Sequence, residues 1–367
     1  MGFSYSQPVK IFFGAGERGR IGEIAASFGH KRALVIADGF LAANGVAGEI
    51  AKCAGTDAVF SAFGADPDIS AADDAAKIAR DIAADHIVAV GGGSAIDLGK
   101  FVAVAAKTGK TAEELFYGDI PEDGLPVIAL PTTAGTGSEV TGVSVMSDGK
   151  RGAKKPLSSP AFFAEAAVVD PKLTLTMPPF VTATCGLDAI AHAVEAYWCR
   201  RHNPVSDAFA EKALKLLFGA IDRAYDDGSD ISARTDMSMG ALLAGLAFAP
   251  TRTAAVHACS YPLSEDFGLP HGEACAFTLD LFLRMNSRFD AERLTALAKT
   301  QGFASADAMA DEIVRIKKRT GMRSTLKDIG CADIASLARE CAVHPLMQNN
   351  IRAYSAEELA EAFGGLD

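Results

Sequence analysis

The sequence predicts an α/β domain built on a parallel sheet, followed by an all-α domain. Three observations predict this. Short runs rich in Val and Ile alternate with amphipathic stretches in the first half, each run stops at a glycine or turn signal, and β-branched runs almost disappear after Asp170-Pro171. Strands that alternate with helices are typical of a parallel sheet with helices on both faces. We therefore expect a nucleotide-binding α/β domain over residues 1–176 and a helical domain over residues 177–367.

Three segments of the first half are predicted to be buried strands with helices between them. Each is about five apolar residues long and ends at a turn signal. The strand candidates are Ala33–Ala37, His86–Val90 and Pro126–Leu130, and the helix candidates are Ala71–Ala84 and Ala95–Thr108. In sheets of this kind, ligands bind at the carboxyl ends of the strands. The loops that follow these strands are therefore the candidate binding loops.

The second half is predicted to be helical throughout. Met177-Pro-Pro179 interrupts the chain between the halves, and apolar residues then recur at helical spacing. The expected helices are Thr182–Cys199, Ser206–Tyr225, Ala233–Phe248, Ala291–Gln301 and Ala306–Thr320. The domain boundary is expected near residues 172–181.

The composition excludes several classes of protein. Of the 367 residues, 49% are hydrophobic and 22% are charged, which is typical of a globular chain and not of a disordered one. The net charge of −11 would repel nucleic-acid phosphates. No run approaches the ~20 apolar residues of a membrane span, and the first residues lack the pattern of a secretory signal. We expect neither nucleic-acid nor membrane partners.

The cysteines indicate a reducing compartment. There are seven, an odd number, and none lies in a C-x-x-C pair. Scattered cysteines of this kind are typical of reduced, mostly buried thiols. A cytoplasmic location is therefore expected.

Three glycine-rich segments are candidates for binding a diphosphate. Gly14–Gly19 matches G-x-G-x-x-G, but the match is weak in a chain with 35 glycines. The other two follow predicted strands directly, and Ser94 is expected to cap the helix after the second segment. We favour these two loops and interpret Gly14–Gly19 as an N-terminal turn; the alternative for each loop is an ordinary strand-to-helix connection. The predicted cofactor contacts in the two loops are Gly91, Gly92, Gly93, Ser94, Asp97, Thr132, Thr133, Thr136 and Ser138.

Asp38 is the candidate for binding an adenosine ribose. It directly follows the strand candidate Ala33–Ala37. A carboxylate in this place accepts hydrogen bonds from the ribose hydroxyls and repels a 2′-phosphate, which favours NAD over NADP. The alternative is that Asp38 only forms the turn before Gly39.

A possible metal site lies in the helical half. Asp188 and His192 are four residues apart and share one helix face. His257 and His271 flank a segment that contains Pro and Gly. Imidazoles with one carboxylate suit a divalent cation and leave a position open for substrate. The alternative is a helix-surface pair with two histidines buried in the core.

Several motifs in this chain resemble those of the iron-containing (group III) alcohol dehydrogenase family, nearly from end to end. The motifs are Phe13-Gly-Ala-Gly16, Gly91-Gly-Gly-Ser-Ala-Ile-Asp-Leu-Gly-Lys100, Pro131-Thr-Thr-Ala-Gly-Thr-Gly-Ser-Glu139, Asp170-Pro171, Gly186-Leu-Asp-Ala-Ile-Ala-His-Ala-Val-Glu195, Leu269-Pro-His-Gly272 and Asn349-Asn-Ile-Arg352.

The resemblance implies an N-terminal nucleotide-binding domain, a helical C-terminal domain and an active site in the cleft between them, as in the dehydroquinate synthase-like architecture. It implies a divalent metal on Asp188, His192, His257 and His271: Fe(II) first, with Zn(II) or Mn(II) as alternatives. It also implies NAD(H) as the cofactor, with Lys154, or its neighbour Lys155, as the lysine beside it. The implied reaction is hydride transfer between NADH and an aldehyde whose carbonyl the metal polarises.

One departure from the family concerns proton transfer. Many members have a further histidine four residues after the third metal ligand, and this chain has Tyr261 there. A phenol with an ordinary pKa near 10 is a weaker proton relay at neutral pH. Tyr261, water or a cofactor hydroxyl therefore remain alternatives for this step, as does simple packing of Tyr261 beside Pro262.

The second departure precedes His257, where the chain has Thr251-Arg-Thr-Ala254 in place of small apolar residues. A guanidinium close to a metal ligand is expected to have an anionic partner. The segment resembles that of members that reduce two-carbon aldehydes bearing a sulfonate or phosphonate. We expect Arg252, with Thr251 or Thr253, to bind the acid group of such a substrate; the alternative is an ion pair with a carboxylate such as Glu265.

Other functions are less consistent with these residues. A neutral short-chain alcohol or diol dehydrogenase is the first alternative. An enzyme of dehydroquinate synthase type would need more basic residues, and a maleylacetate reductase type would not need the four ligand candidates. A non-catalytic nucleotide-binding protein would not need them either. The family resemblance implies a homodimer or a larger homo-oligomer.

Overall fold

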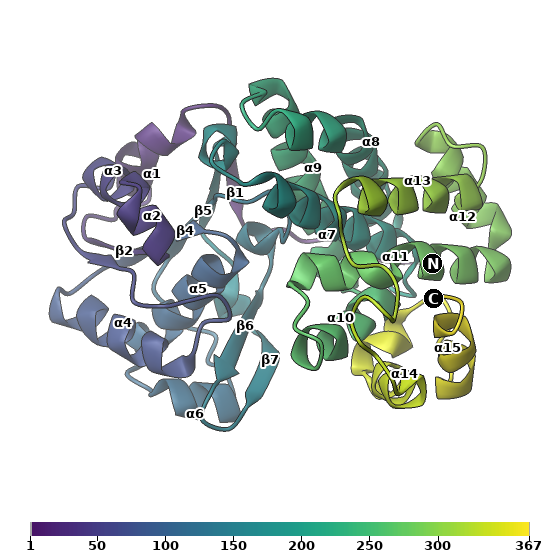
Figure 1. Cartoon of the computed structure of the whole chain (residues 1–367). Helices are drawn as coiled ribbons and strands as arrows, with labels where there is room; N and C mark the ends of the chain where they lie inside the picture. Colours follow the sequence, from purple (N-terminus) through teal and green to yellow (C-terminus); the bar gives the residue numbers. More distant parts are fainter. Residues whose placement is uncertain (1, 367) are drawn as a thin grey trace. The chain divides into compact units, whose positions relative to one another are not determined.

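The computed structural model describes residues 2–366 and divides into two compact units. The α/β unit comprises Gln7–Thr133 and Gly137–Thr176. The helical unit comprises the segment from Met177 to the C-terminal end, together with Ala134–Thr136 and residues 2–6. In Figure 1 the strands lie in the part of the chain coloured purple through teal, and the rest of the chain, up to yellow, is drawn as helices. The predicted fold class is confirmed.

The α/β unit is built on one parallel sheet. Its strands, in spatial order, are β1 (Lys10–Phe13), β8 (Ala166–Val169), β5 (Val127–Pro131), β4 (His86–Gly91), β2 (Ala33–Ala37) and β3 (Val59–Phe60). All of these pairs are parallel. The chain passes from β2 outward to β3 and then crosses back to β4 on the other side of β2. The carboxyl ends of β2 and β4 therefore flank the switch point, where α/β sheets bind their ligands.

Helices cover both faces of this sheet. They are α1 (Ile21–Ser27), α2 (Gly39–Ala43), α3 (Val46–Cys53), α4 (Ile69–Asp81), α5 (Gly93–Thr108) and α6 (Ala112–Tyr117). Val88 and Val90 of β4 join one core cluster with residues of α1 and α3. Successive strand side chains point to opposite faces, so Ile87 and Ala89 face the other side, where α5 packs against them.

Short elements complete the unit. They are the antiparallel hairpin β6 (Val143–Asp148) and β7 (Ala153–Ser158), and the 3₁₀ turns η1 (Glu17–Arg20), η2 (Ser138–Val140), η3 (Pro160–Phe162) and η4 (Pro171–Thr174). The hairpin was not predicted from the sequence, because its second strand has Lys and Pro where a buried strand has Val and Ile.

The helical unit contains nine α-helices among its described residues. They are α7 (Pro179–Trp198), α8 (Pro204–Asp226), α9 (Ile231–Thr251), α10 (Ala255–Glu265), α11 (His271–Phe289), α12 (Ala291–Thr300), α13 (Ala306–Arg319), α14 (Ile334–Val343) and α15 (Ala356–Phe363), with the 3₁₀ turn η5 (Pro345–Asn349). The chain break expected at Met177-Pro-Pro179 is the start of α7, where Pro179 stands at the first helical position. Proline is suited to this position because the N–H it lacks has no partner in the first turn.

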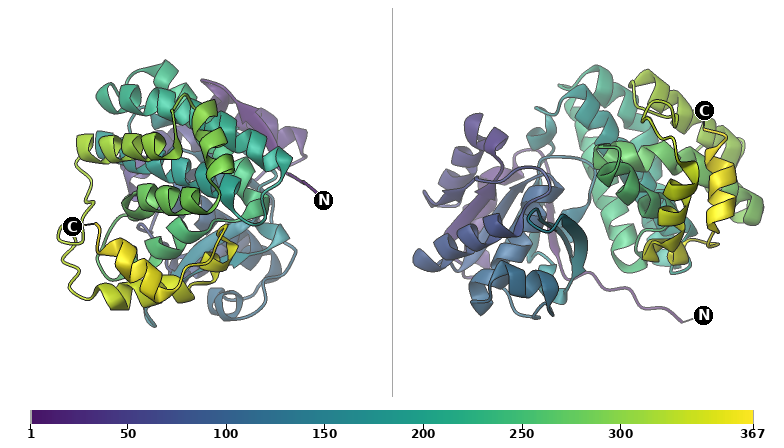
Figure 2. Two further views of the ribbon diagram at one scale, coloured as in Figure 1. Left: turned by 90° about the vertical axis from the view of Figure 1, so that its right-hand side faces the viewer. Right: turned by 60° about the horizontal axis from the view of Figure 1, so that its bottom comes forward.

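One apolar core holds the helical unit together. It includes Trp198 of α7, Phe277 of α11, and Leu337 of α14. Leu359 and Phe363 of α15 join the same core, and the two views in Figure 2 show α14 and α15 side by side in yellow. No single helix in residues 2–366 is long and apolar enough to cross a membrane; only α9 and α10, bent by 104° at the break between them, pass that test as a pair.

Candidate active site

The carboxyl ends of β2, β4 and β5 bring the predicted nucleotide-binding residues together. Asp38 follows β2, and a Cβ placed on Gly91 would lie 3.5 Å from its Oδ2 atom. A Cβ on Gly92 would lie 3.4 Å from both Cγ2 and Oγ1 of Thr133, after the neighbouring strand. The N–H of Thr132 donates to the carbonyl of Gly91. The three loops thus meet at the switch point of the sheet.

The glycines after β4 allow a close approach to the start of α5. Gly91 has a φ of +150°, and a Cβ there would lie 2.6 Å from the Cβ of Ala95. Gly92 is the N-cap of α5 and no side chain caps this helix. The prediction that Ser94 caps it is wrong, because the helix begins at Gly93 and Ser94 already lies in its first turn. The N–H groups of that turn lack a side-chain cap, which is the usual arrangement for binding a phosphate.

Asp38 also has a structural role. Its Oδ1 atom accepts a hydrogen bond of 2.9 Å from the N–H of Leu41 and so caps α2. The turn-forming alternative is therefore part of its function, and Oδ2 lies on the side of Gly91.

The segment Gly14–Gly19 forms an N-terminal turn. The N–H of Gly16 donates to Oδ1 of Asp170 at 2.9 Å, and the N–H of Arg18 lies 3.4 Å from Oδ2 of the same carboxylate. These N–H groups therefore have an internal acceptor, and a phosphate would have to displace it.

Asp97 and Ser138 belong to a buried polar network around Lys100. The Nζ atom of Lys100 donates to the carbonyl and the hydroxyl of Ser138, and Ser138 donates to Oδ1 of Asp97 at 2.5 Å. The other oxygen of Asp97 accepts from the N–H of Val145. Burial lowers the pKa of Lys100 to about 8 and raises the pKa of nearby Glu139 to about 7. Both carboxylate oxygens of Asp97, on α5, are therefore engaged, one with Ser138 of η2 and the other with Val145 of β6.

Two further residues were predicted to contact the cofactor. Lys154, on β7, forms an ion pair of 2.7 Å with Asp66. Thr136 falls within Ala134–Thr136, the short segment that groups with the helical unit.

The helical unit brings together the four predicted metal ligands. Asp188 and His192 lie one turn apart on α7, His257 lies in the first turn of α10, and His271 is the first residue of α11. The Oδ1 atom of Asp188 lies 3.8 Å from Nδ1 of His192, 3.6 Å from Nε2 of His257 and 3.7 Å from Nε2 of His271.

These distances are too long for hydrogen bonds, but they are close to the distances between ligand atoms that bind the same cation. With bonds near 2.1 Å, tetrahedral donors lie about 3.4 Å apart. Oδ1 of Asp188, Nδ1 of His192 and Nε2 of His257 are buried and have no hydrogen-bond partner within residues 2–366. Buried polar atoms without partners are costly, so these three atoms indicate that a ligand belongs there, since the two imidazole nitrogens each lie within 3.8 Å of Oδ1 of Asp188. His271 is the exposed member, with 45% of its side chain accessible.

The protonation states of Asp188 and His192 suit a cation, whereas Cys275 and the neighbouring carboxylates raise the pKa of His257 and of His271. Burial alone would raise the pKa of Asp188, but the imidazoles of His192, His271 and His257 lower it far below its ordinary value. Burial lowers the pKa of His192 to about 3. Asp188 raises this pKa, whereas His257 and His271 lower it further. The site therefore offers a carboxylate and a neutral imidazole at neutral pH, which are the states that bind metal.

Glu195 was not predicted, and it orients His257. Its Oε2 atom lies 2.5 Å from Nδ1 of His257, which directs Nε2 toward Asp188. Its Oε1 atom accepts from the N–H of Val256 at 2.6 Å and so caps the first turn of α10, which lacks a side-chain cap of its own. Carboxylates that hold a ligating histidine in this way are typical of metal sites. The signal was present: Glu195 follows Asp188 by seven residues, two turns along the same helix face.

Cys275 was also missed. It is buried one turn after His271 on α11, and its sulfur lies 3.8 Å from Nε2 of His271. Its sulfur and the donor atoms of Asp188, His257 and His271 all lie within 4.8 Å of one another. Burial would raise the pKa of this thiol, but His257 and His271 lower it below its ordinary value. Its four-residue spacing from His271 is the same signal that identified His192.

Aromatic rings support the cluster. The ring of Phe248 stacks on His192 with 4.2 Å between centroids. Tyr261 lies one turn after His257 on α10, and its ring stacks on the ring of His344 with 4.6 Å between centroids.

Glycine is required at position 272 by close packing. A Cβ there would lie 2.4 Å from the carbonyl oxygen of Thr184, so glycine lets the start of α11 approach α7.

Thr251 is the last residue of α9, and Arg252–Ala254 connect this helix to α10. Thr251 is fully buried, and its hydroxyl lies 3.2 Å and 3.3 Å from the carbonyl oxygens of Ala247 and Arg252. Arg252 and Thr253 are half-buried. They are therefore better candidates for contact with the substrate than Thr251. Burial and the guanidinium of Arg201 lower the pKa of Arg252.

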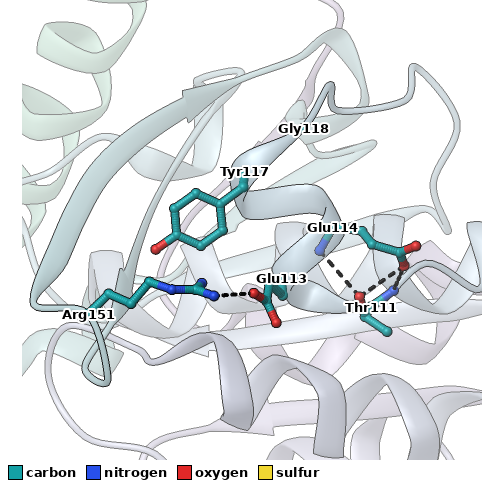
Figure 3. A pocket seen from close by; sticks show the side chains of 6 residues that line it. All are labelled: Thr111, Glu113, Glu114, Tyr117, Gly118 and Arg151. Carbon is teal, nitrogen blue, oxygen red and sulfur yellow. Dashed lines mark hydrogen bonds and ion pairs between the residues drawn. The ribbon is translucent and has the colours of Figure 1, made fainter.

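A pocket of about 610 Å³ lies on the α/β unit (Figure 3). It is lined by Thr111, Glu113, Glu114, Tyr117, Gly118 and Arg151. Arg151 pairs with Glu113 at 2.5 Å, and Tyr117 donates to Asp148. These charged groups satisfy one another, and the pocket includes no residue predicted to bind cofactor, metal or substrate.

Comparison with known proteins identifies the family. The profile described as "Iron-containing alcohol dehydrogenase" matches residues 8–171, and the profile described as "Fe-containing alcohol dehydrogenase family, C-terminal" matches residues 182–364. Together they define an oxidoreductase of the alcohol dehydrogenase class. The chain belongs to the iron-containing alcohol dehydrogenase family.

Individual relatives span most of the chain. Long-chain-alcohol dehydrogenase 1 of Geobacillus thermodenitrificans is 35% identical over 91% of this chain and 88% of its own length. Sulfoacetaldehyde reductase of Bilophila wadsworthia is 32% identical over 77% of this chain and 76% of its own length. Among solved structures, sulfoacetaldehyde reductase from Bifidobacterium kashiwanohense in complex with NAD+ is 38% identical, with a TM-score of 0.96, and covers 100% of this chain and 99% of that one.

Proposed function

We propose that this enzyme is a metal- and NAD(H)-dependent aldehyde reductase whose substrate is a short aldehyde bearing an acid group, such as sulfoacetaldehyde or phosphonoacetaldehyde. Residues 1–176 would bind NAD(H), and residues 177–367 would bind the metal. The proposal includes a cytoplasmic enzyme that forms a homodimer or a larger homo-oligomer. The seven cysteines form no disulfide within residues 2–366, which suits such a location.

Asp188, His192, His257 and His271 would bind the cation. One carboxylate and three imidazoles suit Fe(II), and Zn(II) or Mn(II) accept the same donors. A cation bound there would act as a Lewis acid toward the carbonyl oxygen of the substrate. The residues supply its geometry: Glu195 fixes the ring of His257, and Phe248 packs on the ring of His192. Tyr261 remains the candidate proton donor on this chain.

The loops after β2, β4 and β5 would bind NAD(H). Gly91, Gly92 and Gly93 lead into the uncapped first turn of α5, which suits the diphosphate. The Oδ2 atom of Asp38 suits a ribose diol and would repel a 2′-phosphate. The NAD+ complex of the related sulfoacetaldehyde reductase supports this cofactor.

The position of Arg252 is the observation that carries the choice of an anionic substrate. Arg252 lies in the turn that leads into α10, five residues before His257. Its N–H donates at 2.7 Å to the carbonyl of Phe248, whose ring stacks on His192. Its pKa is lowered by burial and by a second guanidinium, that of Arg201, and two cations brought together favour binding of an anion.

The test compares sulfoacetaldehyde, phosphonoacetaldehyde and propanal as substrates of the wild type and of Arg252→Ala. We expect kcat/KM to fall by about tenfold or more for the two anionic aldehydes and to change little for propanal. An equal loss on all three would reject the acid-group role. The neutral short-chain alcohol or diol dehydrogenase would then be favoured, in line with the 29% identical structure of a 1,3-propanediol oxidoreductase.

A further inference from the structure

The turn that carries Arg252 is held by a side chain from the far end of the sequence. Nδ2 of Asn349, the last residue of η5, lies 2.9 Å from the carbonyl oxygen of Thr251 and 2.9 Å from that of Thr253. These are the two carbonyls on either side of Arg252. The two amide hydrogens of one asparagine thus satisfy both.

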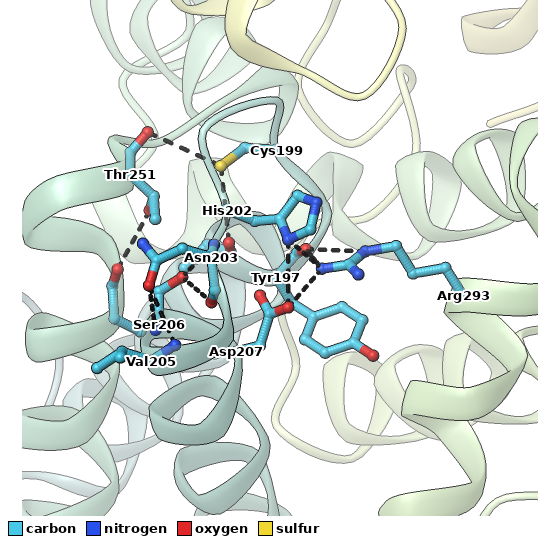
Figure 4. A network of polar contacts seen from close by, with 11 residues as sticks. Tyr197, Cys199, His202, Asn203, Val205, Ser206, Asp207, Thr251 and Arg293 are labelled. Atoms are coloured by element: carbon cyan, nitrogen blue, oxygen red, sulfur yellow. Dashed lines mark hydrogen bonds and ion pairs between the residues drawn. The ribbon is translucent and has the colours of Figure 1, made fainter. Parts of the chain in front are cut away.

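The turn requires such support because the backbone of Arg252 is strained. Its φ is +67° and its ψ is 168°, a conformation that residues with a side chain rarely adopt. Strained residues persist where the surrounding structure over-determines them, and they concentrate at functional sites. Here the N–H of Arg252 is fixed by Phe248, and the carbonyl of Thr251 also lies 3.8 Å from the sulfur of Cys199 (Figure 4).

Asn349 is itself fixed in place. Its own carbonyl accepts from the N–H of Arg200 at 2.9 Å. The next residue, Asn350, has a different role: its amide exchanges hydrogen bonds with the buried side chain of Asn286 and donates to the carbonyl of Arg352. The two adjacent asparagines therefore have different roles. Asn349 fixes the turn at Arg252, and Asn350 fixes the C-terminal segment.

We propose that Asn349 is a positioning residue that holds Arg252 in its strained conformation and thereby sets the affinity for the acid group of the substrate. The inference rests on the proposed function of Arg252. Without the two hydrogen bonds, residue 252 can relax to an ordinary negative φ, and the guanidinium then leaves its position. An anionic aldehyde would lose this contact, whereas a neutral aldehyde never uses it.

The test measures kcat and KM for sulfoacetaldehyde and propanal in Asn349→Ala, with Asn350→Ala as the matched control. We expect the KM for sulfoacetaldehyde to rise about tenfold in Asn349→Ala with a smaller change in kcat, and the KM for propanal to stay within about twofold. Asn350→Ala should lower the melting temperature without changing the ratio of the two KM values. Asn349→Ser, which retains one donor, should lie between wild type and Asn349→Ala and serves as the test if the alanine variant does not fold.

A double-mutant cycle separates this inference from the proposed function. In an Arg252→Ala background, Asn349→Ala should have no further selective effect on sulfoacetaldehyde. If Arg252→Ala is selective and Asn349→Ala weakens both substrates equally, the positioning role is wrong and the proposed function stands. If Arg252→Ala itself weakens both substrates equally, the proposed function fails first.

Discussion

Oε2 of Glu195 lies 2.5 Å from Nδ1 of His257, and the contact is fully buried between α7 and α10. The same carboxylate accepts from the backbone N–H of Val256 through its other oxygen. Glu195 therefore both caps a helix and orients an imidazole whose Nε2 faces Asp188. The carboxylate–imidazole cluster thus depends on a residue that is not itself one of its donors.

Replacing Glu195 by Gln should weaken metal binding. Both carboxylate oxygens accept hydrogen bonds, and an amide would turn its NH₂ group toward one of the donors. We expect metal affinity to fall about 10- to 100-fold, measured by competition with a chelator. Glu273→Gln is the matched control, since Glu273 is equally buried but binds Arg323. Wild-type affinity in Glu195→Gln would contradict the orienting role.

Removing the metal should destabilise the protein. A cation at about 100 times its Kd stabilises the folded state by about 2.7 kcal/mol, equivalent to about 5–10 °C in melting temperature for a unit of this size. Chelation should lower the melting temperature by such an amount, and added Zn(II) should restore it. In Asp188→Asn neither treatment should shift it, whereas Asp280→Asn, which alters a buried carboxylate paired with Lys317, should keep the shift. A chelator-sensitive melting temperature in Asp188→Asn would argue against this ligand.

Asp38→Ser should relax the preference for NADH over NADPH. Serine retains the cap on α2 but removes the charge that would repel a 2′-phosphate. We expect the ratio of kcat/KM with NADPH to that with NADH to rise about tenfold. Asp68→Ser, at the N-cap of α4, removes an equivalent charge and should leave the ratio unchanged. An unchanged ratio in Asp38→Ser would leave Asp38 with its capping role alone.

Because of Glu139, the free energy of unfolding should fall as the pH rises. Burial raises its pKa from 4.5 to about 7, so between these values the folded protein holds a proton that the unfolded chain has released. The stabilisation is complete below about pH 4.5 and is lost as the pH rises through about 7. Melting temperatures at about pH 5 and pH 7 should therefore differ less in Glu139→Gln than in the wild type. The exposed Glu122→Gln should behave as wild type, and an identical pH response in all three proteins would refute the assignment.

Gly272→Ala should disturb His271. The new Cβ would lie 2.4 Å from the carbonyl oxygen of Thr184, and backbone atoms cannot rotate away, so the start of α11 must shift. We expect lower stability together with lower metal affinity. Gly219→Ala on α8 has open space and should slightly stabilise the protein, because alanine favours a helix. Unfolding monitored by circular dichroism and metal titration together measure both effects.

Much of the fold follows from local patterns. The strand Ala33–Ala37 was predicted with the bounds that it has, and the Val- and Ile-rich run before Gly91 is β4 with one further residue. Helix ends were less accurate: α9 continues to Thr251, three residues past its expected end, and contains Pro250. Apolar periodicity reports which residues are buried, but a helix ends where its last carbonyls find other partners.

The pairing of Asp188 with His192 could be inferred from the spacing of one helical turn, because the α-helix imposes that proximity on any sequence. The nucleotide loops could be inferred in the same way, since parallel strands end at one edge of the sheet. The contacts of Glu195 with His257 and of Asn349 with Thr251 join residues 62 and 98 positions apart. No local period relates such residues; they meet because the apolar core packs α7, α10 and the C-terminal segment together, and that packing is a property of the whole chain.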